Sequence, residues 1–184
     1  LILWPEENNF TKIRDAIFSA RHLFDEVVPG RDSIGILSAK PGITEMIEKL
    51  KSVVSNMDHS GNMAKEITTH TLQIEYLSGS EDVKSLCKNL QLAENELFDL
   101  HMSQTFTIEF YGFLPGFPYL SGLPTRLHHP RKSSVTKNIA KGSVAVANEM
   151  CGIYPVVSPG GWHVIGQLKR GFFDATEEVP TILM

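Results

Sequence analysis

Features that mark disulfide-rich, membrane and nucleic-acid-binding proteins are absent from this sequence. Its two cysteines, Cys87 and Cys151, form no CxxC pair and are too few for a disulfide framework, so we expect a reducing, cytoplasmic compartment. No apolar run approaches the roughly 18 residues that a membrane span needs, and no charged-then-apolar signal segment opens the chain. Because the formal net charge is -4 and no block of Lys and Arg occurs, we expect no nucleic-acid and no membrane partner.

Motifs for phosphate binding, metal binding and nucleophilic catalysis are also missing. The chain has no GxxxxGK(S/T), so any nucleotide must bind without a P-loop. The adjacent His128 and His129 point to opposite sides of an extended segment and cannot chelate one ion together, so we expect no metal site. Ser158 in SPGGW lacks the GxSxG elbow, which favours a polar turn residue over a nucleophile.

The composition is that of an ordinary globular protein. Of the 184 residues, 42% are hydrophobic and 21% are charged, and the length allows one large or two small domains. The first part of the chain predicts the order strand, helix, strand, strand, helix, strand. The expected elements are a strand at 1–4, a helix from Asn8 or Asn9 to about Phe24, a hairpin of 27–28 and 33–39 about Pro29-Gly30, a helix after Gly42 and a strand at 71–76.

This order is typical of a ferredoxin-like split βαβ domain, with two helices on one face of an antiparallel sheet. The last strand could equally belong to the next domain. Apolar residues three and four apart mark the faces that the helices should bury. They are Phe10, Ile13, Ile17 and Ala20; then Ile43, Met46, Ile47, Leu50 and Val54; then Val83, Leu86, Cys87 and Leu90, which makes Cys87 a small core residue.

The second half of the chain predicts two short helices followed by strands. Ser80 can cap the first helix, and the second ends near His101. From Gln104 onward apolar and polar residues alternate, and short strands at 105–113, 142–148 and 162–168 are separated by corners rich in glycine and proline, with a polar, basic excursion at 125–141. This pattern predicts an antiparallel barrel or sandwich.

Two stretches combine glycine and proline with aromatic residues, GFLPGFPYLSGLP at 112–124 and GIYPVVSPGGWHVIG at 152–166. Such segments cannot be regular helices, and they are too apolar to be solvated linkers. We interpret them as structured loops that form two walls of one site. The alternative is that both are long barrel corners that pack on their own core.

Anion binding and proton transfer each have candidate residues. Successive amides at Gly160-Gly161 could form an anion-binding nest, with Arg131, Lys132 and Lys141 near in sequence; the alternative is a tight turn with a solvated basic flank. His101 and His163 are the candidate general acids or bases, because His titrates near neutrality. His101 sits at a helix end, where a cation is favoured, and a structural role is the alternative for each histidine.

GFLPGFPYLSGLP, HPR, GSVAVA and GIYPVVSPGGWHVIG, in this order, resemble the allophanate hydrolase subunit 1 family. That family includes the B subunit of 5-oxoprolinase, the sporulation-kinase inhibitor KipI and half of the carboxyltransferase domain of urea carboxylase. The resemblance implies an α+β chain with two domains. An N-terminal ferredoxin-like α/β domain at 1–70 precedes a cyclophilin-like antiparallel β-barrel at 71–184, whose last strand is expected to be missing after Met184.

The resemblance also implies a function within a complex. We expect a subunit of an ATP-dependent 5-oxoprolinase or allophanate-hydrolase-type amidohydrolase, acting with a homologous barrel subunit 2 and a third subunit. ATP and Mg²⁺ would act at the level of the complex rather than on this chain alone. The alternative is a KipI-like regulator that binds and inhibits a sensor histidine kinase. Biotin-dependent carboxyl transfer would need a biotin carrier, which this chain does not supply.

The residues at the matching motifs are the candidate site. His101, His163 and Arg131 are the catalytic candidates. The candidates for binding a substrate or anion are Gly116, Phe117, Tyr119, Tyr154, Ser158, Gly160 and Gly161. The chain departs from the family pattern at Val135, Thr136, Ala140, Met150 and Cys151. These departures remove an Arg and a Gln from the expected site and favour the regulatory alternative.

Overall fold

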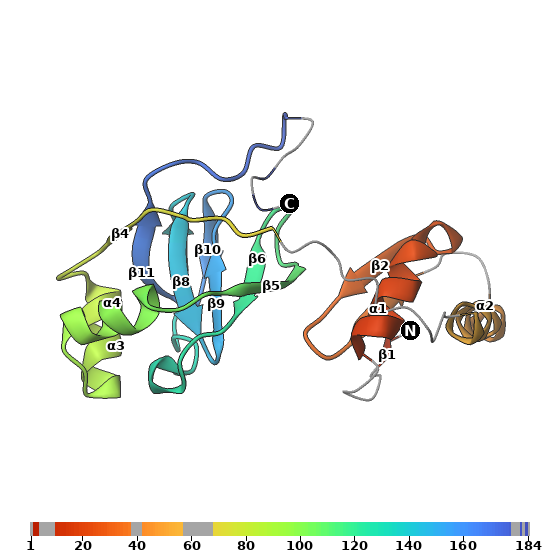
Figure 1. Ribbon diagram of the computed structural model, residues 1–184, viewed down its shortest axis with the longest axis horizontal. Coiled ribbons are helices and arrows are strands. Elements are labelled where there is room, and N and C mark those ends of the chain that lie inside the picture. Colours follow the sequence, from red (N-terminus) through yellow and green to blue (C-terminus); the bar gives the residue numbers. More distant parts are fainter. Residues whose placement is uncertain are drawn as a thin grey trace. The chain divides into compact units, whose positions relative to one another are not determined.

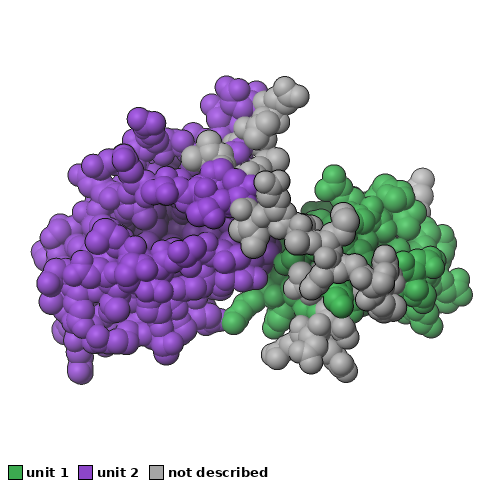
Figure 2. Space-filling view, in the orientation of Figure 1, with its two compact units in different colours: residues 1–67 green, residues 68–184 purple. Residues whose placement is uncertain are grey.

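The computed structural model describes residues 2–3, 10–37, 42–56, 68–177, 181 and 183. The chain divides into two compact units, residues 1–67 and residues 68–184, which Figure 2 shows in separate colours. Both units combine helices with antiparallel sheets, so the chain is α+β, as predicted. In the part of the chain that the structure describes, no helix is both long enough and apolar enough to cross a membrane.

The N-terminal unit contains a three-stranded antiparallel sheet in the order β1-β3-β2. Its elements are β1 (Ile2–Leu3), α1 (Phe10–Ser19), a 3-10 turn (Arg21–Leu23), β2 (Glu26–Pro29), β3 (Ile34–Leu37) and α2 (Ile43–Ser55). Pro29 pairs with Ile34, which confirms the predicted hairpin. The expected caps Asn8 and Asn9 lie outside the described residues.

Two predictions for the N-terminal helices were wrong. α1 ends at Ser19, and a separate 3-10 turn leads to Phe24. In α2 the core contacts come from Met46, Leu50 and Val53, at spacings of four and three. Ile47 lies on the flank of that stripe and Ile43 is the first helical residue, so their side chains are 37% and 65% exposed.

The C-terminal unit is built on a six-stranded antiparallel sheet in the order β4-β11-β8-β9-β6-β5 (Figure 1). A separate two-stranded sheet pairs β10 with β7. The elements of this unit are β4 (Ile74–Tyr76), α3 (Glu81–Leu90), α4 (Glu94–Met102), β5 (Thr107–Tyr111), β6 (Pro118–Ser121), a 3-10 turn (Thr125–Leu127), β7 (Thr136–Ile139), β8 (Ser143–Ala147), β9 (Met150–Ile153), β10 (Ser158–Gly160) and β11 (His163–Leu168). β4 pairs with β11, so this strand belongs to the C-terminal unit, the second of the two alternatives left by the sequence.

The alternation of β8 separates two cores. Val144 and Val146 pack with residues of α3 and α4, which Figure 1 shows side by side next to β11. Ala145 and Ala147 belong to the second core, together with aromatic residues of the neighbouring segments. The small alanine side chains leave space for those large rings, and it is this second core that contains the candidate site.

The two predicted helices between residues 80 and 102 are confirmed. The Ser80 hydroxyl accepts a hydrogen bond from the Val83 amide (3.3 Å) and caps α3. Cys87 is buried in the core, as predicted from its helical stripe.

The two stretches predicted as loops contain strands. Residues 112–124 include β6, and residues 152–166 include the end of β9 and all of β10, while the start of β11 lies in the strand predicted at 162–168. Pro118 is the first residue of β6, a strand position that proline tolerates. The excursion at 125–141 likewise contains β7. Backbone pairing between segments distant in sequence therefore overrides the local glycine and proline signals.

Candidate functional site

A cavity of about 270 Å³ opens in the C-terminal unit, and half of the residues that line it are aromatic. Its lining residues are Phe113, Phe117, Tyr119, Arg131, Val135, Tyr154, Pro159, Gly160, Gly161 and Trp162. They come from both glycine- and proline-rich stretches and from the segment between them, so the two stretches do form walls of one pocket. Small-molecule sites in proteins are typically of this kind, concave and mostly apolar with few polar groups.

Edge-to-face ring contacts hold the wall together. Phe117 contacts Tyr154 and Trp162 with ring centroids 5.1 and 5.7 Å apart and interplanar angles of 85° and 86°. Gly152 on β9 makes this arrangement possible, because an added Cβ would lie 2.6 Å from the Phe117 ring and 3.0 Å from Trp162. The β9 backbone and the aromatic rings are therefore in close contact here, with no room for a larger side chain at Gly152.

Arg131 is the charged residue among those that line the cavity. Its side chain is exposed, and its guanidinium carbon lies 5.8 Å from the centroid of the Trp162 ring, within cation–π range. A guanidinium that is always protonated and sits at an apolar pocket is suited to pair with a carboxylate or phosphate.

Two tyrosines supply neutral hydroxyls to the same pocket. Burial raises the pKa of Tyr154 to about 12, with Tyr119 adding to the rise and Arg131 opposing it. Burial also raises the pKa of Tyr119, against the lowering effect of Arg131. Both phenols therefore stay protonated at neutral pH and can donate hydrogen bonds to a carbonyl or anionic oxygen.

The pocket contains six of the ten predicted site residues: Phe117, Tyr119, Arg131, Tyr154, Gly160 and Gly161. The structure does not bring the other four, His101, His163, Ser158 and Gly116, to the wall of this cavity.

His101 lies in the last turn of α4, with its side chain buried in the core, and it does not line the cavity. Its Nδ1 is 2.8 Å from the Tyr76 hydroxyl, and its Nε2 is 3.4 Å from the Cys151 sulfur. Burial lowers the pKa of His101 to about 4. The prediction of a cation at the helix end was therefore wrong, because loss of hydration disfavours the charged form here.

His163 is buried, does not line the cavity and makes a hydrogen bond to a backbone carbonyl. Its Nε2 donates to the carbonyl of Pro130 at 2.9 Å. Its pKa is lowered, first by burial, so the neutral ring is favoured. Among the described residues, neither His163 Nδ1 nor the buried hydroxyl of Ser158 has a hydrogen-bond partner.

The glycines fill different roles from those expected. Gly160 ends β10 and pairs with Thr136, and an added Cβ would collide with the Tyr154 hydroxyl. Neither Gly160 nor Gly161 has φ in the left-handed range and Gly160 belongs to a strand, so the structure shows neither the amide nest nor its alternative, a tight turn. Gly116 does have a left-handed φ of 79°, and an added Cβ would collide with the Phe173 ring.

Most departures from the family pattern lie outside the pocket. Val135 lines the cavity, and Thr136 accepts a hydrogen bond from Lys132 (2.8 Å). Met150 and Cys151 are buried in the two cores and do not line the cavity. The family pattern has a Gln at this pair of positions. Because neither Met150 nor Cys151 lines the cavity, the loss of that Gln removes no group from the described pocket wall.

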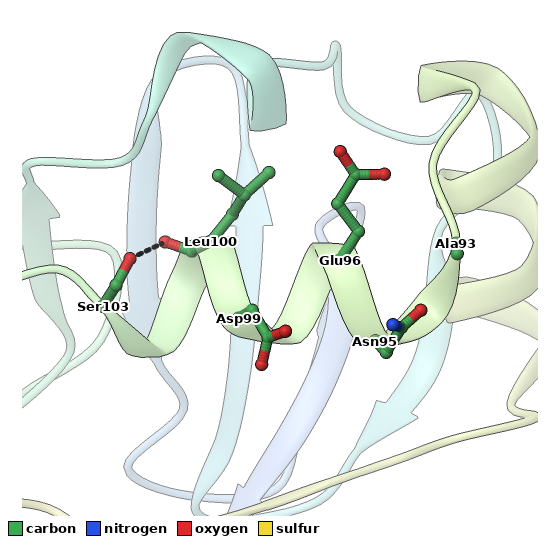
Figure 3. Close-up of a pocket in the computed structure, with 6 residues that line it drawn as sticks. All are labelled: Ala93, Asn95, Glu96, Asp99, Leu100 and Ser103. Carbon is green, nitrogen blue, oxygen red and sulfur yellow. Dashed lines mark hydrogen bonds between the residues drawn. The ribbon is translucent and has the colours of Figure 1, made fainter.

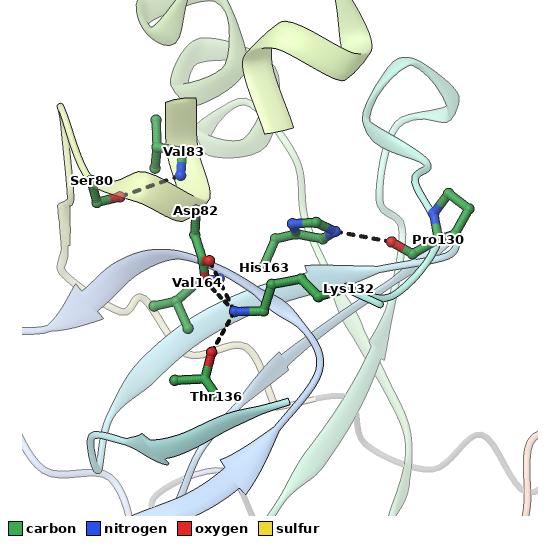
Figure 4. Close-up of polar contacts among 8 residues, drawn as sticks. All are labelled: Ser80, Asp82, Val83, Pro130, Lys132, Thr136, His163 and Val164. Carbon is green, nitrogen blue, oxygen red and sulfur yellow. Dashed lines mark hydrogen bonds and ion pairs between the residues drawn. The ribbon is translucent and has the colours of Figure 1, made fainter. Parts of the chain in front are cut away.

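Sequence reasoning missed Asp82 as part of this region. Asp82 lies in the first turn of α3, and its carboxylate accepts hydrogen bonds from Lys132 and from the Val164 amide (Figure 4). In the sequence, the position of Asp82 is explained by the helix dipole, which favours a carboxylate in the first turn of a helix. That explanation requires no hydrogen-bond partner. No spacing rule links positions 82, 132 and 164.

A second hollow, of about 590 Å³, runs along α4. Figure 3 shows that its lining residues all come from α4 and the residues directly before and after it: Ala93, Asn95, Glu96, Asp99, Leu100 and Ser103. None of these residues is buried. A hollow formed by one exposed helix flank brings no chemical groups together from different elements, and the aromatic cavity is the better candidate site.

The C-terminal unit is thus an antiparallel α+β domain with an aromatic pocket that is lined by one guanidinium. The sequence matches the family described as carboxyltransferase domain, subdomain C and D, over residues 6–183. It is 30% identical over 163 residues to the B subunit of 5-oxoprolinase from Escherichia coli O157:H7, covering 86% of this chain and 72% of that protein. It is 34% identical over 145 residues to the corresponding 5-oxoprolinase protein of Bacillus subtilis (strain 168), covering 77% and 60%. The chain belongs to this carboxyltransferase-domain family, which confirms the resemblance seen in its motifs.

Solved structures share the fold. The crystal structure of TTHA0988 superposes with a TM-score of 0.75 at 23% identity and covers 100% of this chain and 37% of that one. The Kluyveromyces lactis urea carboxylase superposes with a TM-score of 0.64 at 15% identity, covering 97% and 19%. This chain therefore spans only part of the length of the proteins it matches.

Proposed function

We propose that this chain is a non-autonomous subunit of an ATP-dependent amidohydrolase complex of the 5-oxoprolinase type. The observation that carries the proposal is the aromatic pocket, with Arg131 as the one charged residue among the described residues that line it. A small cyclic amide acid such as 5-oxoproline has complementary chemistry. Its ring would lie against the aromatic wall, and its carboxylate would pair with the guanidinium.

The two pocket tyrosines would act on the other end of such a substrate. Because their pKa values are raised, Tyr119 and Tyr154 remain neutral and can donate to the lactam carbonyl oxygen. A hydrogen bond of that kind strengthens as negative charge develops on the oxygen during ring opening. Arg131 would supply binding, and the phenols would supply electrostatic stabilisation.

ATP and Mg²⁺ belong to the other subunits in this proposal. A triphosphate is normally held by several backbone amides and a lysine, together with the bound metal. The described pocket wall offers a single guanidinium. Both relatives are named as one subunit of 5-oxoprolinase, which supports a complex with further subunits.

A homologous barrel protein, subunit 2 of the complex, is the partner that we propose. Phe113 and Val135 line the pocket, yet their side chains are 57% and 64% exposed. Exposed apolar residues at a pocket mouth favour a protein surface that covers them. The finer assignments of a ferredoxin-like N-terminal domain, a cyclophilin-like barrel and a cytoplasmic location are part of the same proposal.

Reconstitution tests the proposal. We expect glutamate to form from 5-oxoproline and ATP only when this chain is mixed with its subunit 2 and third subunit. Arg131→Ala should lower kcat/KM about tenfold or more, the loss typical of one charge-assisted contact. Arg126→Ala is the matched control, because Arg126 is an exposed arginine that pairs with Glu96 and does not line the pocket.

The control variant should retain wild-type activity. No ATP-dependent glutamate formation in the complete mixture would contradict the proposed function. Equal activity of Arg131→Ala and wild type would contradict the role given to Arg131 while leaving the complex itself in place.

A KipI-like regulator is the second candidate, and the exposed Phe113 and Val135 favour it as much as they favour a barrel partner. Such a protein would bind a sensor histidine kinase and lower its autophosphorylation. Autophosphorylation assays with the host's kinases, with and without this chain, separate the two functions. Unchanged phosphorylation of every kinase would exclude the regulator.

A further inference from the structure

Arg131 lies in a segment without regular secondary structure. The segment runs from the isolated bridge at His129 to the start of β7 at Thr136. An exposed arginine has many rotamers, and holding it in one place costs conformational entropy. If Arg131 binds a ligand at the pocket, neighbouring residues have to fix its backbone and limit that freedom.

Three consecutive residues of the segment face three consecutive residues, Gly161 to His163, that lead into β11. The Pro130 carbonyl accepts from His163 Nε2 at 2.9 Å. The Lys132 amide donates to the Gly161 carbonyl at 2.7 Å. Between these two contacts, the Arg131 guanidinium lies over the Trp162 ring. Both backbone neighbours of Arg131 are therefore hydrogen-bonded to the residues on either side of Trp162, its cation–π partner.

Asp82, in α3, makes hydrogen bonds to both the segment around Arg131 and the strand that follows Trp162. Its carboxylate oxygens lie 2.7 and 2.9 Å from Lys132 Nζ, and one of them also accepts from the Val164 amide at 2.8 Å. Figure 4 shows the Lys132 ammonium between the Asp82 carboxylate and the Thr136 hydroxyl, which is 2.8 Å away. The side chains of Lys132 and Asp82 are 14% and 22% exposed, so water screens the pair only partly.

The Val164 amide explains why a hydrogen-bond acceptor is needed at this place. β4 pairs with β11 only at Gly166–Leu168, with one further bond from Leu77 to Ile165. Asp82 supplies the acceptor for the next amide along the strand, beyond the reach of β4. One carboxylate thus satisfies a strand-edge donor and holds the lysine that follows Arg131.

We propose that Asp82 is a positioning residue for Arg131, which it holds over Trp162 at the pocket through Lys132 and β11. The proposal rests on the proposed function, in which the Arg131 guanidinium binds the carboxylate of the substrate. His163 also positions Arg131, because its hydrogen bond to the Pro130 carbonyl fixes the residue that precedes Arg131. The Asp82 carboxylate itself does not line the pocket, so the proposal gives it no contact with the substrate.

The first experiment needs no enzyme activity. In a Trp4→Phe background, Trp162 is the sole tryptophan, and acrylamide quenching of its fluorescence reports the access to its ring. We expect Arg131→Ala to raise the quenching constant, because the guanidinium no longer covers the ring. Asp82→Asn should raise it in the same direction and should add nothing in the Arg131→Ala background, since coupled residues give non-additive effects.

Two further variants separate positioning from general stability. Glu94→Gln is the matched control: Glu94 is a first-turn carboxylate of α4 that holds Ser78 and Gly79, and it should leave Trp162 quenching unchanged. Lys132→Met removes the other partner of Asp82 and should reproduce the effect of Asp82→Asn. It also keeps the test decisive if Asp82→Asn does not fold.

The second experiment uses the reconstituted complex with 5-oxoproline as the probe. Asp82→Asn should raise KM about tenfold with little change in kcat, because it loosens a binding group and leaves the reacting atoms in place. Asp82→Glu, which keeps the charge, should restore part of the loss. In the Arg131→Ala background the Asp82 change should have no further effect on KM.

Each outcome decides one of the two proposals. If Asp82→Asn and Lys132→Met leave quenching and KM at wild-type values while Arg131→Ala changes both, the positioning role is overturned and the proposed function stands. If Asp82→Asn raises quenching only when Arg131 is present, but Arg131→Ala leaves KM unchanged, Asp82 positions Arg131 and the substrate-binding role fails.

Discussion

His101 is held in the core by two weakly acidic neighbours, the Tyr76 hydroxyl and the Cys151 thiol. Burial raises the pKa of each of these groups to about 12. The three side chains are therefore all neutral near pH 7, and the interior contains no unpaired charge at this place. Such a cluster specifies packing, and it makes the fold sensitive to acid.

Unfolding free energy should fall as the pH is lowered from about 6.5 towards 4. The folded pKa of His101 is about 4, below its ordinary value of 6.5, so below pH 6.5 the unfolded chain takes up a proton that the folded chain does not. The full loss is about 3 kcal/mol for this shift. Urea titrations followed by Trp162 emission in the Trp4→Phe background measure it.

The variant His101→Gln should flatten this pH dependence, because it retains a hydrogen-bonding side chain and cannot titrate. His163, whose pKa is also lowered by burial, contributes with the same sign and leaves a residual slope. His70→Gln, at an exposed position, serves as the control and should keep the wild-type slope. An unchanged slope in His101→Gln would assign the acid sensitivity to other groups.

Among the strands, β8 and β9 determine how much room the pocket has. β8 places valines in one core and alanines in the other, and β9 places Gly152 beneath Phe117. β8 and β9 are paired through Ala145 and Gly152, so the smallest residues of both strands lie together. The aromatic wall rests on this floor of small residues.

Gly152→Ala should destabilise the C-terminal unit by about 1–3 kcal/mol, the usual range for an overpacked core. The added methyl group would meet the Phe117 ring, and movement of that ring should also narrow the pocket and weaken 5-oxoproline binding. Urea unfolding and a binding titration give the two measurements. Gly171→Ala is the control, because nothing lies within 4 Å of its added Cβ. Equal free energies of unfolding for the two variants would contradict this prediction and show that the residues around Gly152 can move to make room for the methyl group.

At the scale of the whole chain, the hydrophobic cores follow the division into two compact units. The buried cluster around Ile17, Ile34 and Met46 belongs wholly to residues 1–67. The two clusters on either side of β8 belong to residues 68–184. Each unit therefore has the hydrophobic core that a domain needs.

Residues 68–184 alone should fold, because every described strand partner and core residue of this unit lies within that range. A fragment of this range should show cooperative urea unfolding with the same Trp162 midpoint as the full chain carrying Trp4→Phe. A fragment without near-ultraviolet circular dichroism would contradict this and would show that the N-terminal unit is required for packing.

The presence of the helices, the first hairpin and the core role of Cys87 were predictable from residues close together in the sequence, and the family from four short motifs. Periodicity and turn chemistry depend on near neighbours, which is why the Pro29-Gly30 hairpin and the Ser80 cap agree with the structure. The pairing of β4 with β11, the placement of His101 in the core and the strand at Gly160 depend on distant partners instead. Burial and strand register, which local spacing does not encode, brought Arg131 to Trp162 and Asp82 to Lys132.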